Sequence, residues 1–255
     1  MIGLPRTPSF RLDGKAALVV GASSGIGQAA AVALAEAGAQ VTLAARSVGK
    51  LEQTVDALGE RGLATTSLAL DVEDVEATEK RLSVLPAFDI LVNSAGVARH
   101  GPALETTVFD FDTVMGINVR GAYFITRAVA RKLLAEKRSG SLINISSQMA
   151  HVGGIDRAVY SATKHAVEGF TKSMAIEWGM HGIRVNTICP TFIRTQLAEQ
   201  TFSNPDRVRW IEEKIKLGRI GELTDIMGPV TFLASDAAAM ITGSALMVDG
   251  GWTAD

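Results

Sequence analysis

The chain of 255 residues contains one cysteine, Cys189, so no disulfide can form within it, and we expect it to work in the reducing cytoplasm. Charged residues make up 20% of the chain and give a net charge of −2, which offers no basic excess for nucleic acid or an anionic membrane. No apolar run reaches the ~18 residues of a transmembrane helix, and residues 1–15 lack the apolar core of a signal peptide. A small molecule is therefore the expected partner, with no nucleic acid and no membrane.

The sequence also lacks a recognisable metal motif and any sign of a boundary between domains. The histidines show no paired spacing with carboxylates or with the cysteine, so no metal is expected; they are His100, His151, His165 and His181. Hydrophobic residues make up 47% of the chain, enough for a sizeable core, and no linker or low-complexity tract interrupts it. We therefore expect one domain over residues 1–255.

Apolar runs and helical periods alternate along the whole chain. Strands are predicted at residues 16–20, 40–45, 65–70, 89–92, 141–145, 183–189 and 245–248. Helices are predicted at about residues 28–37, 48–61, 75–85, 111–137, 160–179 and 224–234. This alternation predicts an α/β fold, a Rossmann-like doubly wound parallel sheet with helices on both faces, whose ligands bind beyond the carboxyl ends of the strands. The polar stretch 196–220 is predicted to be a mobile lid.

A glycine-rich loop follows the first strand and precedes the first helix. Its residues are Gly21, Ala22, Ser23, Ser24, Gly25, Ile26 and Gly27. Glycines allow a tight turn and a close approach to a pyrophosphate, whose negative charge is stabilised by the helix N-terminus. An ordinary turn also collects glycine, but the flanking strand and helix favour a dinucleotide site here.

The end of the second strand bears on the choice of cofactor. Enzymes that use NAD often carry an acid at this point, where it binds the ribose hydroxyl. Here Ala45 stands at that point and is followed by Arg46 and Ser47, and a guanidinium suits the 2′-phosphate of NADP. We therefore expect NADP(H) to be preferred over NAD(H), although Arg46 could instead be solvated or stack on the adenine.

Tyr160 and Lys164 are the candidate catalytic pair. They are four residues apart on a predicted helix, hence on one face, and Ser147 precedes the tyrosine by 13 positions. An adjacent ammonium is expected to lower a phenol pKa that is normally about 10. Alone, such a pair is more often a solvated helix contact. Other candidate site residues follow the predicted strand ends, and because these ends meet at one edge of the sheet, the pair is expected to lie among them. This convergence favours a catalytic role for Tyr160 and Lys164.

Five motifs carry a family resemblance. They are Gly21-x-x-x-Gly25-Ile26-Gly27, Asn93-Ser94-Ala95-Gly96, Asn118, Ser147 and Tyr160-x-x-x-Lys164. Taken together they are highly specific, and from about residue 15 to the C-terminus the chain resembles a compact short-chain dehydrogenase/reductase. The resemblance implies that Tyr160 is the general acid/base and that Ser147 donates a hydrogen bond to the substrate oxygen. It further implies that Lys164 holds the nicotinamide ribose and that Asn118 helps to position a water in a proton relay.

The same resemblance implies further cofactor contacts and an assembly. Asp71 and Val72 would meet the adenine, and Ile193 and Thr195 the carboxamide. The remaining implied cofactor residues are Asn93, Ala95, Gly96 and Pro190. The chain departs from the family pattern at three positions, namely Val20, Ser94 and Thr191, and Thr191 bears on the placement of residues 193 and 195. A homotetramer is expected.

The expected activity is the NAD(P)-dependent interconversion of a carbonyl and a secondary alcohol by hydride transfer. The substrate site is expected at residues 98–100, 148–157 and 196–220, where polar or cationic side chains suit a keto-sugar acid or a polyol. These side chains are Arg99, His100, His151, Arg157, Arg207 and Arg209. A 3-oxoacyl thioester or a simple ketone remains an alternative substrate, and a non-catalytic cofactor-binding or sensor protein remains an alternative function.

Overall fold

The computed structural model describes residues 3–254, apart from the side chains of residues 197 and 200. Its centre is one parallel sheet of seven strands in the order β3-β2-β1-β4-β5-β6-β7. The strands are β1 Ala16–Val20, β2 Gln40–Ala45, β3 Thr65–Ala69, β4 Ile90–Asn93, β5 Gly140–Ile145, β6 Ile183–Pro190 and β7 Ala245–Val248. The order reverses beside β1, which pairs with both β2 and β4, so the predicted doubly wound sheet is confirmed.

Continuous apolar runs form the central strands because both faces of the sheet are covered. In β1, Ala17 and Val19 are fully buried in one core cluster, while Leu18 and Val20 are buried in the other. Successive side chains of a strand point to opposite faces, so a single short strand contributes to both cores. The carboxyl ends of β1, β4 and β5 are thereby held in register.

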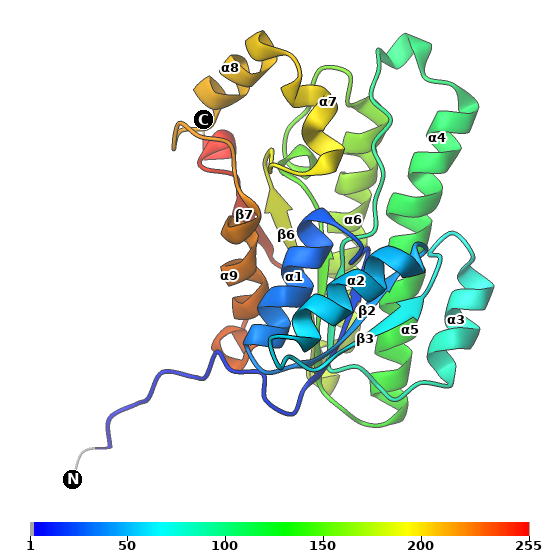
Figure 1. Ribbon diagram of the computed structural model, residues 1–255, viewed down its shortest axis with the longest axis vertical. Coiled ribbons are helices and arrows are strands. Elements are labelled where there is room, and N and C mark those ends of the chain that lie inside the picture. Colours follow the sequence, from blue (N-terminus) through cyan, green and yellow to red (C-terminus); the bar gives the residue numbers. More distant parts are fainter. Residues whose placement is uncertain (1–2, 255) are drawn as a thin grey trace.

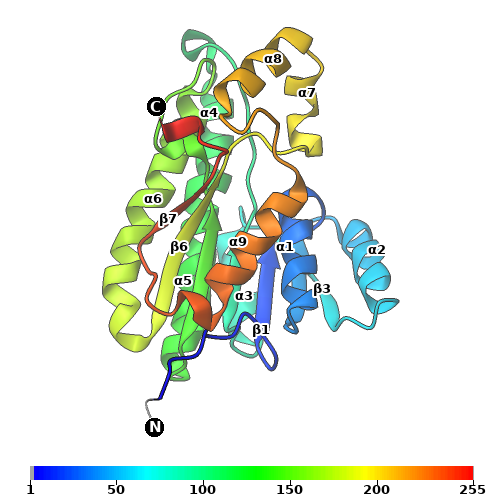
Figure 2. The same cartoon turned by 90° about the vertical axis from the view of Figure 1, so that its left-hand side faces the viewer.

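Helices cover both faces of the sheet (Figures 1 and 2). One core cluster receives side chains from α1 Gly25–Glu36, α2 Val48–Gly59 and α9 Leu223–Ala234. The other receives them from α3 Val75–Ser83, α5 Ala122–Ala135 and α6 Ala158–Trp178. The alanines of α1 let it pack closely on the sheet, so its first turn meets the glycine loop. No helix within residues 3–254 has the combination of length and apolar character needed to span a bilayer.

The predicted continuous helix over residues 111–137 is wrong in its middle. The structure has α4 Val108–Met115, then a π-helical segment η2 Gly116–Gly121, then α5. Asn118 lies inside the π-helical turn, where its amide bonds to the backbone of Val97 instead of facing solvent. π-helical turns interrupt α-helices mostly at functional sites, so the interruption itself points to this region.

The predicted lid segment is helical and lies beyond the carboxyl ends of the strands (Figure 1). It contains α7 Glu199–Phe202 and α8 Pro205–Lys214, and Asn204 caps α8 by accepting hydrogen bonds from the backbone of residues 206 and 207. Ile211 and Trp252 belong to a small core under this segment. The 3₁₀ turns are η1 Ala103–Glu105, η3 Gln148–Ala150, η4 Gly179–His181, η5 Gln196–Ala198, η6 Asp236–Ala238 and η7 Trp252–Ala254.

Candidate active site

A cleft of about 660 Å³ opens at the carboxyl ends of the strands, within the usual size range of small-molecule sites. Most of the site residues predicted from the sequence line it: Gly21, Ser23, Ser24, Gly25, Ile26, Arg46, Ser47, Asp71, Val72, Ala95, Gly96, Ser147, Tyr160, Lys164, Pro190, Ile193 and Thr195. Three others do not line the cleft: Gly27, Asn93 and Asn118. They contact the segments that form its wall.

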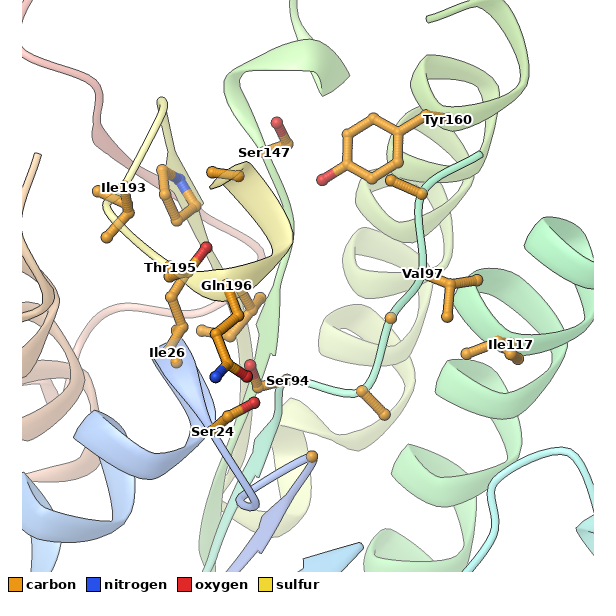
Figure 3. A pocket seen from close by; sticks show the side chains of 18 of the residues that line it. Ser24, Ile26, Ser94, Val97, Ile117, Ser147, Tyr160, Ile193, Thr195 and Gln196 are labelled. Carbon is orange, nitrogen blue, oxygen red and sulfur yellow. The ribbon is translucent and has the colours of Figure 1, made fainter. Parts of the chain in front are cut away.

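Two positions of the glycine loop have no room for a side chain. Gly21 has a φ of 78°, and a Cβ atom there would lie 2.7 Å from the backbone nitrogen of Ala95. A Cβ atom on Gly27 would overlap the carbonyl oxygen of Gly21. Ser24 precedes α1 without a side-chain capping bond, so the first N–H groups of the helix are left to face the cleft (Figure 3). A phosphate fits there.

Two buried asparagines hold the loop that follows β4. The Asn93 amide donates to Asn144 Oδ1 at 3.1 Å, and Asn93 Oδ1 accepts from the Ala95 backbone at 3.3 Å. The Asn118 amide both accepts from the Val97 N–H and donates to the Val97 carbonyl, each at 2.9 Å. The Asn118 side chain is thus a clamp on this loop, which forms one wall of the cleft.

Tyr160 and Ser147 meet inside the cleft. Tyr160 lies in the first turn of α6 and its phenol oxygen points toward Ser147, which follows β5 (Figure 3). Burial raises the pKa of the Tyr160 phenol, while the hydrogen bond with Ser147 and the charge of Arg157 oppose that rise. The structure therefore keeps the phenol protonated at neutral pH.

Lys164 differs from its predicted role in one respect. Its ammonium donates to the Ile145 carbonyl at 2.9 Å and lies 5.5 Å from the centre of the Tyr160 ring. The lysine is therefore directed at the backbone, and the rise that burial causes in the Tyr160 pKa is opposed by Ser147 and Arg157, not by Lys164. Burial also lowers the pKa of Lys164 to about 8, opposed by Cys189 and Glu168.

The end of the cleft beside Tyr160 contains a buried cation. Arg157 lines it and is only 6% exposed, yet its guanidinium forms no hydrogen bond or ion pair with any residue that the structure describes. His100 also lines it, with its ring centre 5.7 Å from that of Tyr160. Burial, then the charges of Arg157 and Arg207, lower the pKa of His100 to about 4, so it is neutral at pH 7.

The other cationic candidates lie elsewhere. Arg99 pairs with Asp110 at 3.1 Å, and Arg209 pairs with Asp206 at 3.7 Å on the surface. Arg207 lies beside the cleft and pairs with Asp156 at 4.0 Å. His151 packs against Cys189 on β6. Of the six cationic side chains predicted for the substrate site, only His100 and Arg157 line the cleft.

Comparison with known proteins agrees with this geometry. The family model described as enoyl-(acyl carrier protein) reductase matches residues 21–253, the span from the glycine loop to the C-terminal turn. The chain belongs to the short-chain dehydrogenase/reductase family. It is thus an NAD(P)-dependent oxidoreductase that interconverts a carbonyl and a secondary alcohol, as the motifs predict.

Among curated short-chain dehydrogenases, 2-dehydro-3-deoxy-D-gluconate 5-dehydrogenase of Dickeya dadantii is 36% identical, covering 96% of this chain and 98% of that protein. D-threitol dehydrogenase of Mycolicibacterium smegmatis is 41% identical, covering 96% and 95%. The structure of a gluconate 5-dehydrogenase from Burkholderia cenocepacia with NADP and tartrate superimposes with a TM-score of 0.92 at 34% identity, covering 96% and 98%.

The cleft of this short-chain dehydrogenase fits a nicotinamide dinucleotide. The glycine loop leaves room only for backbone, and the buried Gln148 Oε1 and Thr191 Oγ1 atoms lack hydrogen-bond partners within the described structure. Sequence reasoning missed several lining residues: Ile145, Ser146, Val97, Ile117 and Phe192. The first two directly precede Ser147 and could have been found from it. Val97 and Ile117 (Figure 3) are likewise the direct neighbours of the predicted Gly96 and Asn118.

Proposed function

We propose that this enzyme uses NADP(H) to interconvert a keto-sugar acid and the corresponding hydroxy acid. The observation that carries this proposal is Arg157, a buried guanidinium that lines the cleft beside Tyr160 without a carboxylate partner in the described chain. A buried charge is costly unless it is paired, and a carboxylate forms bidentate hydrogen bonds with a guanidinium. A substrate carboxylate supplies that partner.

The neighbouring charges support an anionic substrate. Arg157 and Arg207 are near enough to interact, and the one acid that acts on both is Asp156. His100, beside them, is neutral because its pKa lies at about 4. Two cations and one anion leave a net positive charge at this end of the cleft, which favours binding of a carboxylate.

The relatives support two substrate classes. The Dickeya dadantii and Burkholderia cenocepacia proteins are named for sugar acids, and the latter structure contains tartrate, a hydroxylated dicarboxylate. The Mycolicibacterium smegmatis protein is named for a neutral polyol, so a keto-sugar and polyol pair is the second candidate. The unpaired Arg157 supports the acid.

The proposed roles follow from the geometry. In the reducing direction Tyr160, whose phenol is protonated at neutral pH and whose pKa burial raises further, donates its proton to the carbonyl oxygen. Ser147 donates a second hydrogen bond to the same oxygen and stabilises its developing charge. Lys164 serves the nicotinamide ribose, and Asn118 is a positioning residue that holds Val97. The bound cofactor supplies the hydride.

For the cofactor, the preference for NADP(H) rests on the end of β2. Ala45 brings no carboxylate that would repel a 2′-phosphate, and Arg46 lines the cleft beside Ser47. Arg46 lies 3.7 Å from Glu73 in an exposed ion pair, and such pairs are weak enough for a phosphate to replace the acid. The guanidinium is therefore free to bind the 2′-phosphate.

The assembly proposed is a cytoplasmic homotetramer, each chain a single domain whose segment 196–220 closes over substrate. Phe109 on α4 and Ile176 on α6 are large apolar side chains that are 68% and 83% exposed. Such side chains favour burial between subunits. Light scattering that finds a monomer at working concentration would overturn the tetramer.

The substrate proposal is tested by Arg157→Gln. With 5-keto-D-gluconate, kcat/KM should fall roughly tenfold to a hundredfold, the value of one charge-assisted hydrogen bond, while kcat/KM for neutral L-xylulose changes less than about threefold. Arg209→Gln, a change at an exposed arginine of α8, is the matched control and should alter neither value. An equal loss on both substrates would show that Arg157 shapes the cleft and binds no carboxylate.

A further inference from the structure

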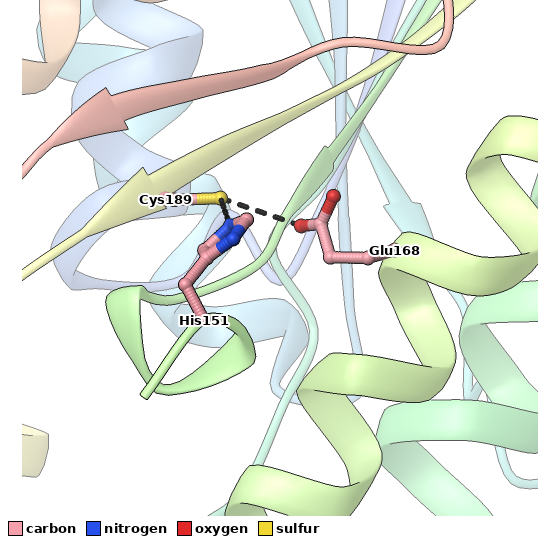
Figure 4. Close-up of side chains that lie close together, drawn as sticks. All are labelled: His151, Glu168 and Cys189. Atoms are coloured by element: carbon pink, nitrogen blue, oxygen red, sulfur yellow. Dashed lines mark hydrogen bonds between the residues drawn. The ribbon is translucent and has the colours of Figure 1, made fainter. Parts of the chain in front are cut away.

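Three potential metal ligands meet beside the active site. His151 ends the turn after Ser147, Glu168 lies on α6 one turn beyond Lys164, and Cys189 lies near the end of β6 (Figure 4). Their ligand atoms all lie within 4.8 Å of one another. None of the three lines the cofactor cleft. They come from three separate elements, which is why their sequence spacing predicts no metal site.

The distances match a tetrahedral metal. Cys189 Sγ lies 3.5 Å from His151 Nε2 and 3.3 Å from Glu168 Oε1. Zinc bonds of about 2.3 Å to sulfur and about 2.0–2.2 Å to nitrogen or oxygen, at tetrahedral angles, separate neighbouring ligand atoms by roughly 3.5 Å. The two distances from Cys189 Sγ therefore fit one tetrahedral ion, and the ligand atoms of His151 and Glu168 lie within 4.8 Å of each other.

Glu168 is the second observation that favours a cation. It is only 6% exposed, and its carboxylate accepts from Thr187 Oγ1 at 3.0 Å and from the Cys189 thiol. No lysine or arginine among the described residues lies within ion-pair distance of it; Lys164, one turn earlier on α6, interacts with its charge from farther away and donates to the Ile145 carbonyl. A buried carboxylate without a cation in direct contact is costly. His151 is exposed, which gives an ion a path into the site.

We propose that His151 Nε2, Glu168 Oε1 and Cys189 Sγ form a Zn²⁺ site, with water as the fourth ligand. Thiolate and imidazole select zinc over magnesium or calcium. On binding, the thiol S–H bond breaks, its proton passes to solvent, and a Zn–S bond forms without any redox change. The ion joins β6, α6 and the turn after Ser147, and it takes no part in the hydride transfer.

The test uses the metal-stripped full chain titrated with Co²⁺ and then Zn²⁺. Cys189 is the only cysteine, so a thiolate-to-cobalt charge-transfer band can arise from this site alone. One Co²⁺ per chain should give the band, and one Zn²⁺ should abolish it by displacement. Zn²⁺ should also raise Tm, since a ligand that binds only the folded state stabilises it. No band at saturating Co²⁺ would mean that the trio is a hydrogen-bonded network without metal.

Variants assign the ligands. Cys189→Ala should remove the band and weaken Zn²⁺ binding by more than about a hundredfold, beyond the effect of outer-shell changes. His151→Ala alters an exposed side chain and keeps the fold, and it should weaken Zn²⁺ binding at least about tenfold. His181→Ala on η4, also exposed, is the matched control and should bind as the parent does. Equal Zn²⁺ affinity in the parent and His151→Ala would overturn the proposal, even if Cys189→Ala did not fold.

Discussion

The two ends of the cleft are lined by different kinds of group. We call the part at the ends of β1 and β4 the backbone end, and the part at the ends of β5 and β6 the chemical end. At the ends of β1 and β4 the wall is backbone and small side chains, such as Gly21, Ala95 and Gly96. At the ends of β5 and β6 it contains buried ionisable groups, among them Lys164 and Arg157. The first end can bind a dinucleotide through backbone N–H groups, and the second can move protons and select charge.

The largest expected effect is a loss of kcat on substitution of Tyr160 at the chemical end. Tyr160→Phe removes the proposed proton donor and should lower kcat by about 10²–10⁴-fold, the usual contribution of general acid–base catalysis. NADPH affinity, measured by isothermal titration, should change less than about threefold because the ring remains in place. Tyr123→Phe, on the outer part of α5, should leave kcat unchanged. Substantial turnover by Tyr160→Phe across the pH range would contradict the mechanism.

The next largest effect is a loss of NADPH affinity and stability on substitution of Gly27 at the backbone end. A Cβ atom at Gly27 overlaps the Gly21 carbonyl, so Gly27→Ala should displace the loop, weaken NADPH binding more than about tenfold and destabilise the fold by about 1–3 kcal/mol. Gly59→Ala places its Cβ in open space at the end of α2 and should do neither. Fluorescence titration of NADPH and urea unfolding measure both. Unchanged NADPH affinity in Gly27→Ala would mean that the loop does not bind the pyrophosphate.

The preference between NADPH and NADH is expected to depend on charge at the end of β2, beside the backbone end. Ala45→Asp should shift the ratio of kcat/KM for NADPH over NADH toward NADH by roughly tenfold to a hundredfold. The added carboxylate repels a 2′-phosphate and accepts from a ribose hydroxyl. A parent enzyme that already favours NADH would show the assignment of Arg46 to be wrong.

The smallest expected effect concerns stability. The pKa of Lys164 lies near 8, below its usual 10.5, so the unfolded chain holds this proton more tightly than the folded one. Burial of the ammonium therefore costs stability below pH 8, and the cost disappears as pH rises to 10.5. Lys164→Met should stabilise the cofactor-free protein by about 1–3 kcal/mol at pH 7, with a smaller gain at pH 10. Urea unfolding at the two pH values checks this, and a loss of stability at pH 7 would contradict it.

The two ends also differ in how well the sequence predicts them. The glycine loop, β1 at Ala16–Val20 and β2 at Gln40–Ala45 follow from local patterns and are placed as predicted. The start of α1 differs by three residues, at Gly25 instead of residue 28, because the loop glycines form its first turn, and β4 is displaced by one residue. Local residue types determine such elements.

The chemical end depends on contacts between distant segments, which a sequence pattern does not contain. Within the π-helical turn, the Asn118 amide bonds to Val97, 21 residues away. The pKa of Tyr160 rises because the fold buries it, which the spacing to Lys164 could not show. The trio of His151, Glu168 and Cys189 is likewise a product of packing. At this end the packing of distant segments determines which side chains meet, and their burial shifts their pKa values.

The most direct test of the account is the substrate preference of the unaltered enzyme. With NADPH at saturation, kcat/KM for 5-keto-D-gluconate and for neutral L-xylulose should be measured side by side. Arg157, buried in the cleft without a partner among the described residues, predicts a preference for the acid of at least about tenfold. Equal values, or a preference for L-xylulose, would contradict the claim that the cleft recognises a carboxylate.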